Sequence, residues 1–404
     1  AHTSPGADMH RLRLGVTGGA VLLIIVSILV PPQAIAAQEV IESVTPRAPD
    51  LTVADEPRMR VGIVDGPLEY IFGNVTGAVR LEDGSIVVAD EQSGNIRRYD
   101  ADGRHIWTSG RSGEGPGEYE GLRLLRNCPG APLTVFDWSL DRITELDLDG
   151  NVRATRSLLA AGVRPYNGPF CAPDGRLVYT PWPDDMGESY EEGLAEGDVY
   201  RWQTTLASVE GESVVTLRPG IPGAERFFIE AGASGPRWWG RDMEFAPTGT
   251  GVWYGTADDY ELEQVDWTGR VTRVARWAGP DLTVTSERVD RYREGWLARY
   301  DDPGARRNFE RDVWPDIRDQ LPERFPAYEA LIALPDGAFW VKTHGWLAPG
   351  EELHLLDASG AWLRRLTLPS GSVLDAGRDW VLLRQRDELG VPTVALYDLV
   401  ETGG

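Results

Sequence analysis

The sequence predicts an all-β protein, a six-bladed β-propeller with a small helical insertion between blades 4 and 5. Three observations lead to this fold class. A pattern of turn, strand, turn and strand recurs six times along the 404 residues. The chain contains 46 Gly and 28 Pro, which indicates many tight turns between short strands. The turn glycines of the first two copies, Gly84 and Gly130, are separated by about the length of one propeller blade.

The N-terminal segment, residues 1–37, has the three parts of a secretory signal peptide. Basic residues cluster at 10–13, an apolar run follows over 16–30, and small residues lie at 34–37. The apolar run is shorter than the ~20 residues that span a bilayer comfortably. We therefore expect a cleaved leader and no stable membrane span after signal cleavage, with an uncleaved anchor as the alternative. The mature protein is then secreted or periplasmic, with residues 38–57 as a linker and 58–404 as the propeller.

The first two copies show the repeat most clearly. In the first copy, the turn at 81–84 precedes a strand at 85–90, and a second strand at 95–99 ends in another turn. The second copy has strands at 133–137 and 142–146. Asp-Gly pairs between such apolar runs are strong hairpin signals, because the turn needs a positive φ that Gly adopts at little cost.

The four later copies keep the turns with less regular strands. Their first recognisable strands are expected at residues 176–180, 252–254, 338–341 and 380–383. The sixth copy ends before it completes a blade, whereas residues 58–64 form a lone strand before the first copy. We expect this strand to pair with the last blade, because that pairing closes the ring and removes an exposed edge.

The first copy and its continuation resemble an NHL-type repeat. More narrowly, residues 113–119, Gly-Glu-Gly-Pro-Gly-Glu-Tyr, match the G-x-G-P-G-E-[FY] element of a family of bacterial secreted six-bladed propellers. The resemblance covers most of the chain after about residue 55. It implies a fold and a location outside the cytoplasm, and many members of the family have no assigned activity.

Two insertions lengthen the third and fourth copies. The first, residues 181–197, is acidic and reads as a solvated loop or as a cation-binding loop over one mouth of the propeller. The second, at about 283–328, is helical; Pro303-Gly304 separates two helices, and Pro322 ends the second of them. It packs on the propeller as an amphipathic pair or forms a cap that shapes a pocket. Its apolar positions repeat at helical spacing: Val289, Tyr292, Trp296, Tyr300, Phe309, Val313, Ile317 and Leu321.

The two cysteines, Cys128 and Cys171, end predicted strands in consecutive copies. In an oxidising compartment an even number of cysteines allows a disulfide. Neighbouring blades could bring the pair together, and two separately buried thiols are the alternative.

The net charge of -23 and the pI of about 4.7 limit the partners. A surface this acidic repels phosphate backbones, so we expect no nucleic-acid binding. The sequence contains no nucleophile elbow, P-loop or H-E-x-x-H motif, and its five histidines are scattered. The sequence therefore offers no catalytic motif, and it leaves open whether the protein is an enzyme.

Five residues are candidates for ligand binding. Glu118 follows a Gly-rich connection, where it could face the channel or cap backbone N–H groups. Trp239 and Arg241 open the fourth copy, and Lys342 and His344 follow a strand of the fifth. Trp and Arg near the mouth of a propeller suit a small organic or saccharide ligand, although ordinary packing between blades is the alternative.

Two functions from different classes follow. The first is a ligand- or protein-binding module of the cell envelope, whose partner is an unknown envelope protein or a small ligand. The second is a metal-assisted hydrolase or lyase, similar to gluconolactonase-like propellers that hold a divalent ion. No cofactor is identified from the sequence, but an acidic chain could supply oxygen ligands to Ca²⁺.

Overall fold

The computed structural model describes residues 38–126, 128, 133–182, 193–211, 213–230, 233–345, 351–369, 371–387 and 390–402. The expected signal peptide, residues 1–37, and the acidic residues 184–192 of the first insertion lie outside these ranges. Within the described ranges, no helix is both long and apolar enough to cross a membrane.

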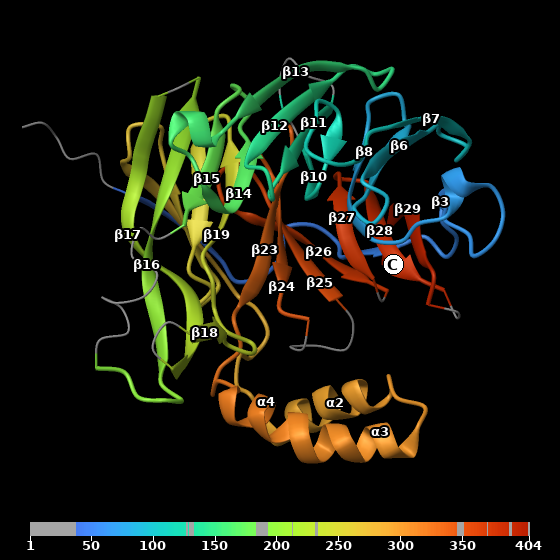
Figure 1. Ribbon diagram of the computed structural model, residues 1–404. Helices are drawn as coiled ribbons and strands as arrows, with labels where there is room; N and C mark the ends of the chain where they lie inside the picture. The colour runs from blue at the N-terminus through green and yellow to red at the C-terminus, as the bar shows by residue number, and fades with distance from the viewer. Residues whose placement is uncertain are drawn as a thin grey trace, which may run out of the picture. The chain divides into compact units, whose positions relative to one another are not determined.

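The chain folds as a β-propeller, with each copy of the repeat forming antiparallel strands in a radial order (Figure 1). From the first copy to the fifth, the first strands of consecutive copies contact one another, and that of the sixth contacts that of the first. We call these the inner strands. They are β4 (Val75–Arg80), β10 (Leu122–Leu125), β14 (Pro165–Cys171), β19 (Glu244–Thr248), β23 (Tyr328–Ala333) and β27 (Ser372–Ala376).

The remaining strands follow outward in each copy. The second strands are β5 (Ile86–Asp90), β11 (Leu133–Asp137), β15 (Leu177–Pro181), β20 (Gly251–Gly255), β24 (Phe339–Thr343) and β28 (Trp380–Arg386). The third are β6 (Asn95–Tyr99), β12 (Arg142–Leu146), β16 (Val199–Glu210), β21 (Glu261–Val265), β25 (Glu351–Leu356) and β29 (Pro392–Glu401). The fourth are β7 (His105–Ser109), β13 (Val152–Ser157), β17 (Ser213–Glu230), β22 (Val271–Trp277) and β26 (Trp362–Leu368).

Short elements connect the copies or extend them. Strand β18 (Ala233–Pro236) adds to the third sheet, and β8 (Arg111–Ser112) pairs with β9 (Glu118–Tyr119). The 3-10 turns η1 (Leu68–Tyr70) and η2 (Leu159–Ala161) lie in loops.

Asp-x-x-Gly turns join the third and fourth strands. In the first of them, Oδ1 of Asp100 accepts hydrogen bonds from the backbone N of Asp102 and of Arg104. Gly103 adopts a φ of 78°, which a residue with a side chain rarely takes. Asp147, Asp266 and Asp357 form the same turn in later copies. One local side-chain bond thus fixes the hairpin at equivalent points of the propeller.

The core consists of buried clusters that lie between consecutive copies. Val87 and Ile96 of the first copy pack with Leu122 and Val135 of the second, for example. Another cluster joins residues of the sixth copy to residues of the first. Because these contacts link the last copy to the first, the sheets form a closed ring.

Residues 38–57 are not a free linker, contrary to the sequence analysis. They contribute β1 (Glu39–Ser43), which pairs in parallel with β22, and β2 (Leu51–Val53), which pairs with both β26 and β29. Leu51 is buried in the core between the fifth and sixth copies. The segment was missed because these strands are short and lack the turns that mark the repeat.

The expected closing strand pairs with the last copy. Strand β3 (Met59–Val61) runs antiparallel to Leu396–Val394 of β29. Strand β2 joins the fifth and sixth copies into one nine-stranded sheet. The blade count therefore stays a prediction.

The second insertion is helical, as expected, and lies between β22 and β23 (Figure 1). It consists of α2 (Ser286–Leu297), α3 (Pro303–Asn308), the π-helical turn η3 (Phe309–Val313) and α4 (Trp314–Gln320). The side chains of Thr285 and Asp302 cap α2 and α3 by accepting backbone hydrogen bonds. Tyr292, Phe309 and Ile317 are buried against the fourth and fifth copies.

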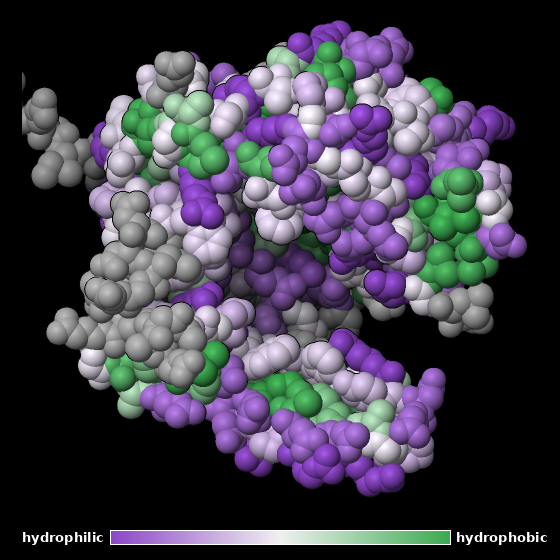
Figure 2. All heavy atoms as spheres, in the orientation of Figure 1, coloured by the Kyte–Doolittle hydropathy of each residue, from purple (hydrophilic) through white to green (hydrophobic). Residues whose placement is uncertain are grey.

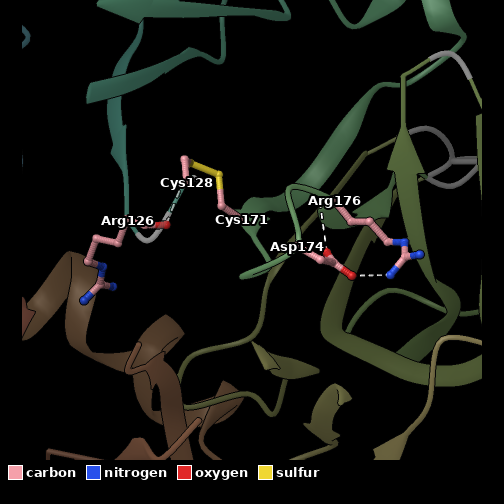
Figure 3. Close-up of a disulfide and its surroundings, with 5 residues drawn as sticks. All are labelled: Arg126, Cys128, Cys171, Asp174 and Arg176. Atoms are coloured by element: carbon pink, nitrogen blue, oxygen red, sulfur yellow. Dashed lines mark hydrogen bonds and ion pairs between the residues drawn. A yellow bond between two sulfur atoms is a disulfide. The ribbon is translucent and has the colours of Figure 1, made fainter. Parts of the chain in front are cut away.

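Cys128 and Cys171 form a disulfide between the segment after β10 and the end of β14 (Figure 3). The bridge therefore joins the second and third copies at the ends of their inner strands.

Candidate functional site

Charged residues gather where the inner strands begin. Arg123 lies on β10, Glu244 begins β19 and Glu329 lies on β23, so three copies contribute to one group. Asp242 immediately precedes β19. Glu244 interacts electrostatically with all three of the others. Inner strands from different copies meet only around the propeller axis, which places this group at one mouth of the channel.

A cleft of about 530 Å³ adjoins this group. Arg123 and Tyr166 line it together with Arg164 and the aromatic rings of Trp138 and Trp182. The Tyr166 ring lies edge-on to Trp182 and Trp202, with centroids 5.0 and 4.9 Å away. Figure 2 shows a hollow with hydrophilic residues between the helical insertion and the strands.

Glu244 is the most unusual residue of the mouth. Burial raises its pKa well above the usual value, and the carboxylates of Asp242 and Glu329 raise it further. Within the described part of the chain, no residue lies within hydrogen-bond or ion-pair distance of its carboxylate. A buried structural carboxylate normally has such partners. The Glu244 side chain is only partly buried, so its carboxyl is open to a ligand in the channel.

Asp242 is a second carboxyl group with a shifted pKa. Burial raises the pKa to about 6, although the hydrogen bond from the Met243 amide (2.7 Å) and the charges of Arg201 and Arg226 oppose the rise. Burial raises the pKa of Tyr166 to about 12, and the charges of Asp242 and Glu244, two residues apart in the chain, contribute to the rise. The two carboxyls and the phenol form one electrostatic group.

Arg123 faces this group from the second copy. Burial lowers its pKa and the charge of Glu244 counteracts that effect, yet the side chain is exposed to solvent. A deep position combined with contact to water is typical of a residue that lines a narrow channel. Its guanidinium is available to a ligand, with one long hydrogen bond to the Gly168 carbonyl (3.4 Å).

Lys342 is held by two carboxylates of neighbouring strands. Its Nζ lies 2.8 Å from Glu329 and 3.2 Å from Glu351. Burial alone would lower the pKa of Lys342, but the two carboxylates raise it. The lysine therefore stays charged and fixes Glu329 at the mouth.

His344 and Trp239 pack together beneath the helical insertion. Their rings are 6.1 Å apart, and Phe325 contacts both. Burial lowers the pKa of His344 to about 4, so the imidazole is neutral at pH 7. Its Nδ1 is buried without a hydrogen bond among the described residues. Trp239 is buried as well, and it joins the helices to the rim of the channel.

Arg241 belongs to an ion-pair network of the rim. Its guanidinium contacts the buried Glu225 of β17 and also Asp258. Arg201 binds the same Asp258 at 3.0 Å. With both sides of its guanidinium paired, Arg241 orients the third and fourth copies.

Glu118 lies apart from these residues, in the connection between the first and second copies. Its carboxylate accepts a hydrogen bond from the Gly115 amide (2.8 Å) and pairs with Arg111. The Gly115 bond and then Arg111 lower its pKa. Glu118 thus caps a local backbone turn, one of the two roles considered from the sequence.

The structure brings Trp239, Lys342 and His344 together at the same rim as Asp242 and Glu244. The sequence analysis did not identify five residues of this group as candidates: Arg123, Tyr166, Asp242, Glu244 and Glu329. Asp242 ends the Arg- and Trp-rich stretch at 237–242, which was a usable signal. The sequence held no signal for Glu244 and Arg123, because these two residues come close together only when the ring of sheets closes.

The described residues include no group of three or more His, Cys, Asp or Glu side chains placed to hold a metal ion.

Fold and site together define the class of the protein, a β-propeller with a charged cleft at one mouth of its channel. No protein-family model matches the sequence, and no curated protein sequence matches it. Among solved structures, a putative exported protein from Bacteroides fragilis is 12% identical, with 91% of this chain and 100% of that chain covered and a TM-score of 0.45.

Two further similar structures are proteins with stated activities. Regucalcin from Agrobacterium tumefaciens, a calcium-binding protein, is 11% identical, with 90% of this chain and 97% of that chain covered and a TM-score of 0.40. Virginiamycin B lyase from Staphylococcus aureus is 9% identical, with 84% and 98% covered and a TM-score of 0.38.

Proposed function

We propose that this protein is an extracytoplasmic binding module that holds a small saccharide at the channel mouth around Arg123, Tyr166 and Glu244. The observation that carries the proposal is the carboxyl of Glu244, which lies deep in the mouth without a protein partner among the described residues. The signal-like sequence at 1–37 and the disulfide support a location in an oxidising compartment.

The chemistry of the cleft favours a polyhydroxylated ligand. Sugar hydroxyls both donate and accept hydrogen bonds, which matches the guanidinium groups of Arg123 and Arg164 in the cleft and the carboxyls of Asp242 and Glu244 beside it. The aromatic rings at Tyr166 and Trp182 offer apolar surface to the C–H face of a sugar ring. A cleft of about 530 Å³ is within the range of small-molecule sites.

We also infer that the propeller has six blades with NHL-like repeats. The six copies, each with its own inner strand, and the clusters between consecutive copies support this count.

The binding proposal is tested on a glycan array with the labelled chain 38–404, followed by calorimetry with the best-bound sugar. We expect Glu244→Ala to weaken binding at least about tenfold, because alanine removes every hydrogen bond that the carboxyl can make to a sugar hydroxyl. Glu210→Ala is the matched control, since its side chain is 70% exposed and lies on an outer hairpin. Equal affinity of the two variants would remove Glu244 from the site.

The array also separates the alternatives. Absence of binding to every sugar contradicts the saccharide proposal. Calcium titration of the same protein tests the metal-assisted alternative: a stoichiometric Ca²⁺ lost in Glu244→Ala would favour that alternative over a metal-free binding module.

A further inference from the structure

A second and larger cavity lies at the other ends of the inner strands. Its volume is about 640 Å³, and the last residues of β4, β10, β23 and β27 line it. All inner strands run in the same direction along the channel, so this cavity is at the mouth opposite to the charged cleft. Apolar side chains such as Leu81, Leu125 and Leu148 form much of its wall.

An ion pair crosses the channel beside this cavity. Arg126 of the second copy lies 3.3 Å from Asp375 of the sixth. Asp375 also accepts a hydrogen bond from the backbone N of Arg80 (2.9 Å), which belongs to the first copy between them. The buried carboxylate of Asp375 thus contacts residues of the first and second copies from its place in the sixth. It neutralises the charge of Arg126 but not that of Arg80, which it contacts only through the backbone.

Arg80 supplies a cation without a counter-charge. Its guanidinium stacks over the Trp380 ring at 5.0 Å. Its Nε is buried and lacks a hydrogen bond, and no described residue pairs with the guanidinium. A buried N–H without an acceptor is costly unless a ligand or water supplies one, and the rest of this guanidinium is only partly buried and open to the cavity.

Two other carboxylates line the cavity. Asp83 is bound by Arg98, whose guanidinium lies 2.6 Å away, and by Ser85. Glu82 is exposed at the rim. The interior therefore offers one unpaired positive charge, an aromatic ring and an apolar wall.

We propose that this cavity binds an organic monocarboxylate with an apolar body, such as an aryl-substituted fatty acid. The carboxylate would accept hydrogen bonds from Arg80, and the body would lie against the leucines and Trp380. The site is distinct from the saccharide cleft and does not depend on that proposal.

The disulfide fixes the second arginine of the cavity. Cys128 also lines the cavity, and its Sγ lies 3.8 Å from the carbonyl oxygen of Arg126. Figure 3 shows the Arg126 side chain pointing away from the bridge to Cys171. The bridge thus holds the backbone that carries the Arg126–Asp375 pair.

The test is calorimetry of the chain 38–404 with 4-phenylbutyrate and with its neutral analogue, 4-phenylbutyramide. We expect one molecule of the carboxylate to bind and the amide to bind at least about tenfold more weakly, because only the carboxylate pairs with Arg80. Equal affinities would overturn the proposal, and so would the absence of carboxylate binding at millimolar concentration.

Variants locate the ligand. Arg80→Gln should weaken carboxylate binding about tenfold, whereas Arg104→Gln, whose side chain is 74% exposed on an outer turn, should leave it unchanged. Asp375→Asn should strengthen binding, because it frees Arg126 and removes a like charge. If Arg80→Gln and Arg104→Gln bind equally, the site is elsewhere. Should Arg80→Gln not fold, the comparison of carboxylate with amide and the effect of Asp375→Asn decide the outcome.

Discussion

Asp242 illustrates how the channel mouth alters a single group. Its pKa is raised from 3.8 to about 6, mainly by burial. The folded state thus holds the proton more tightly than the unfolded chain does, and the charged form opposes folding. The loss of folding stability from the charged Asp242 is therefore absent below pH 3.8 and grows as the pH rises to about 6. Since one pKa unit corresponds to about 1.4 kcal/mol, the full cost is about 3 kcal/mol.

We therefore expect Asp242→Asn to stabilise the protein at pH 7.5 by about 1–3 kcal/mol, less than the full cost because Asp242 keeps some contact with solvent. The gain should shrink at pH 4.5, where much of the wild-type carboxyl is protonated in the folded state. Urea unfolding at the two pH values measures the difference. Asp149→Asn, on an exposed turn, is the control. A gain that is the same at both pH values would contradict the raised pKa.

Single residues of the site were only partly predictable. The stretch at 237–242 and the pair Lys342 and His344 were recognised from charge and aromatic content, and they do lie at one rim. Their roles were not visible, because Trp239 is a packing residue and Arg241 is fully paired. Glu244 begins an ordinary strand, and nothing local distinguishes it from a solvent-facing glutamate.

At the scale of elements, the helical insertion shows both the strength and the limit of periodicity. Helices on both sides of residue 300 were predicted, and Tyr292, Phe309 and Ile317 are buried. Pro303-Gly304 was expected to break the helices apart, but it forms the first turn of α3. Val313 was expected on the same face, but its side chain is 44% exposed. The π-helical turn over Phe309–Val313 adds a residue to one turn and moves Trp314 inward instead.

The N-terminal strand β2 contributes a buried side chain to the core, whereas β1 lies at the surface. Leu51 is 5% exposed and packs in the core between the fifth and sixth copies. Leu51→Ala should lower the free energy of unfolding by about 2 kcal/mol or more, because it leaves a cavity. Val40→Ala, on β1 with the side chain 49% exposed, should change it by less than about 0.5 kcal/mol. Chemical unfolding compares the two, and equal small effects would mean that β2 contributes no core contact.

For the whole molecule, the repeat predicted the propeller because each copy carries its own turns. Closure was predicted for a different reason. The last copy lacks a strand and the strand at 58–64 has no copy of its own, so pairing the two completes the ring. The nine-stranded sheet was not predictable, since β2 has only three residues and pairs with strands more than 300 positions away.

Closure by β3 can be tested by truncation. A chain that starts at residue 58 lacks β1 and β2 but keeps the pairing of Met59–Val61 with β29. A chain that starts at residue 63 lacks this pairing too, which leaves the backbone of Val394–Leu396 as an open edge beside the buried residues of the first copy. We expect the first chain to elute from a sizing column as the same species as the chain 38–404, but to melt at a lower temperature because it lacks the buried Leu51. The second should self-associate or melt at a still lower temperature, because an unpaired edge recruits other strands and the ring is no longer closed. If the two truncated chains elute and melt alike, β3 does not close the propeller, and the contacts between the sixth and first copies alone must hold the ring.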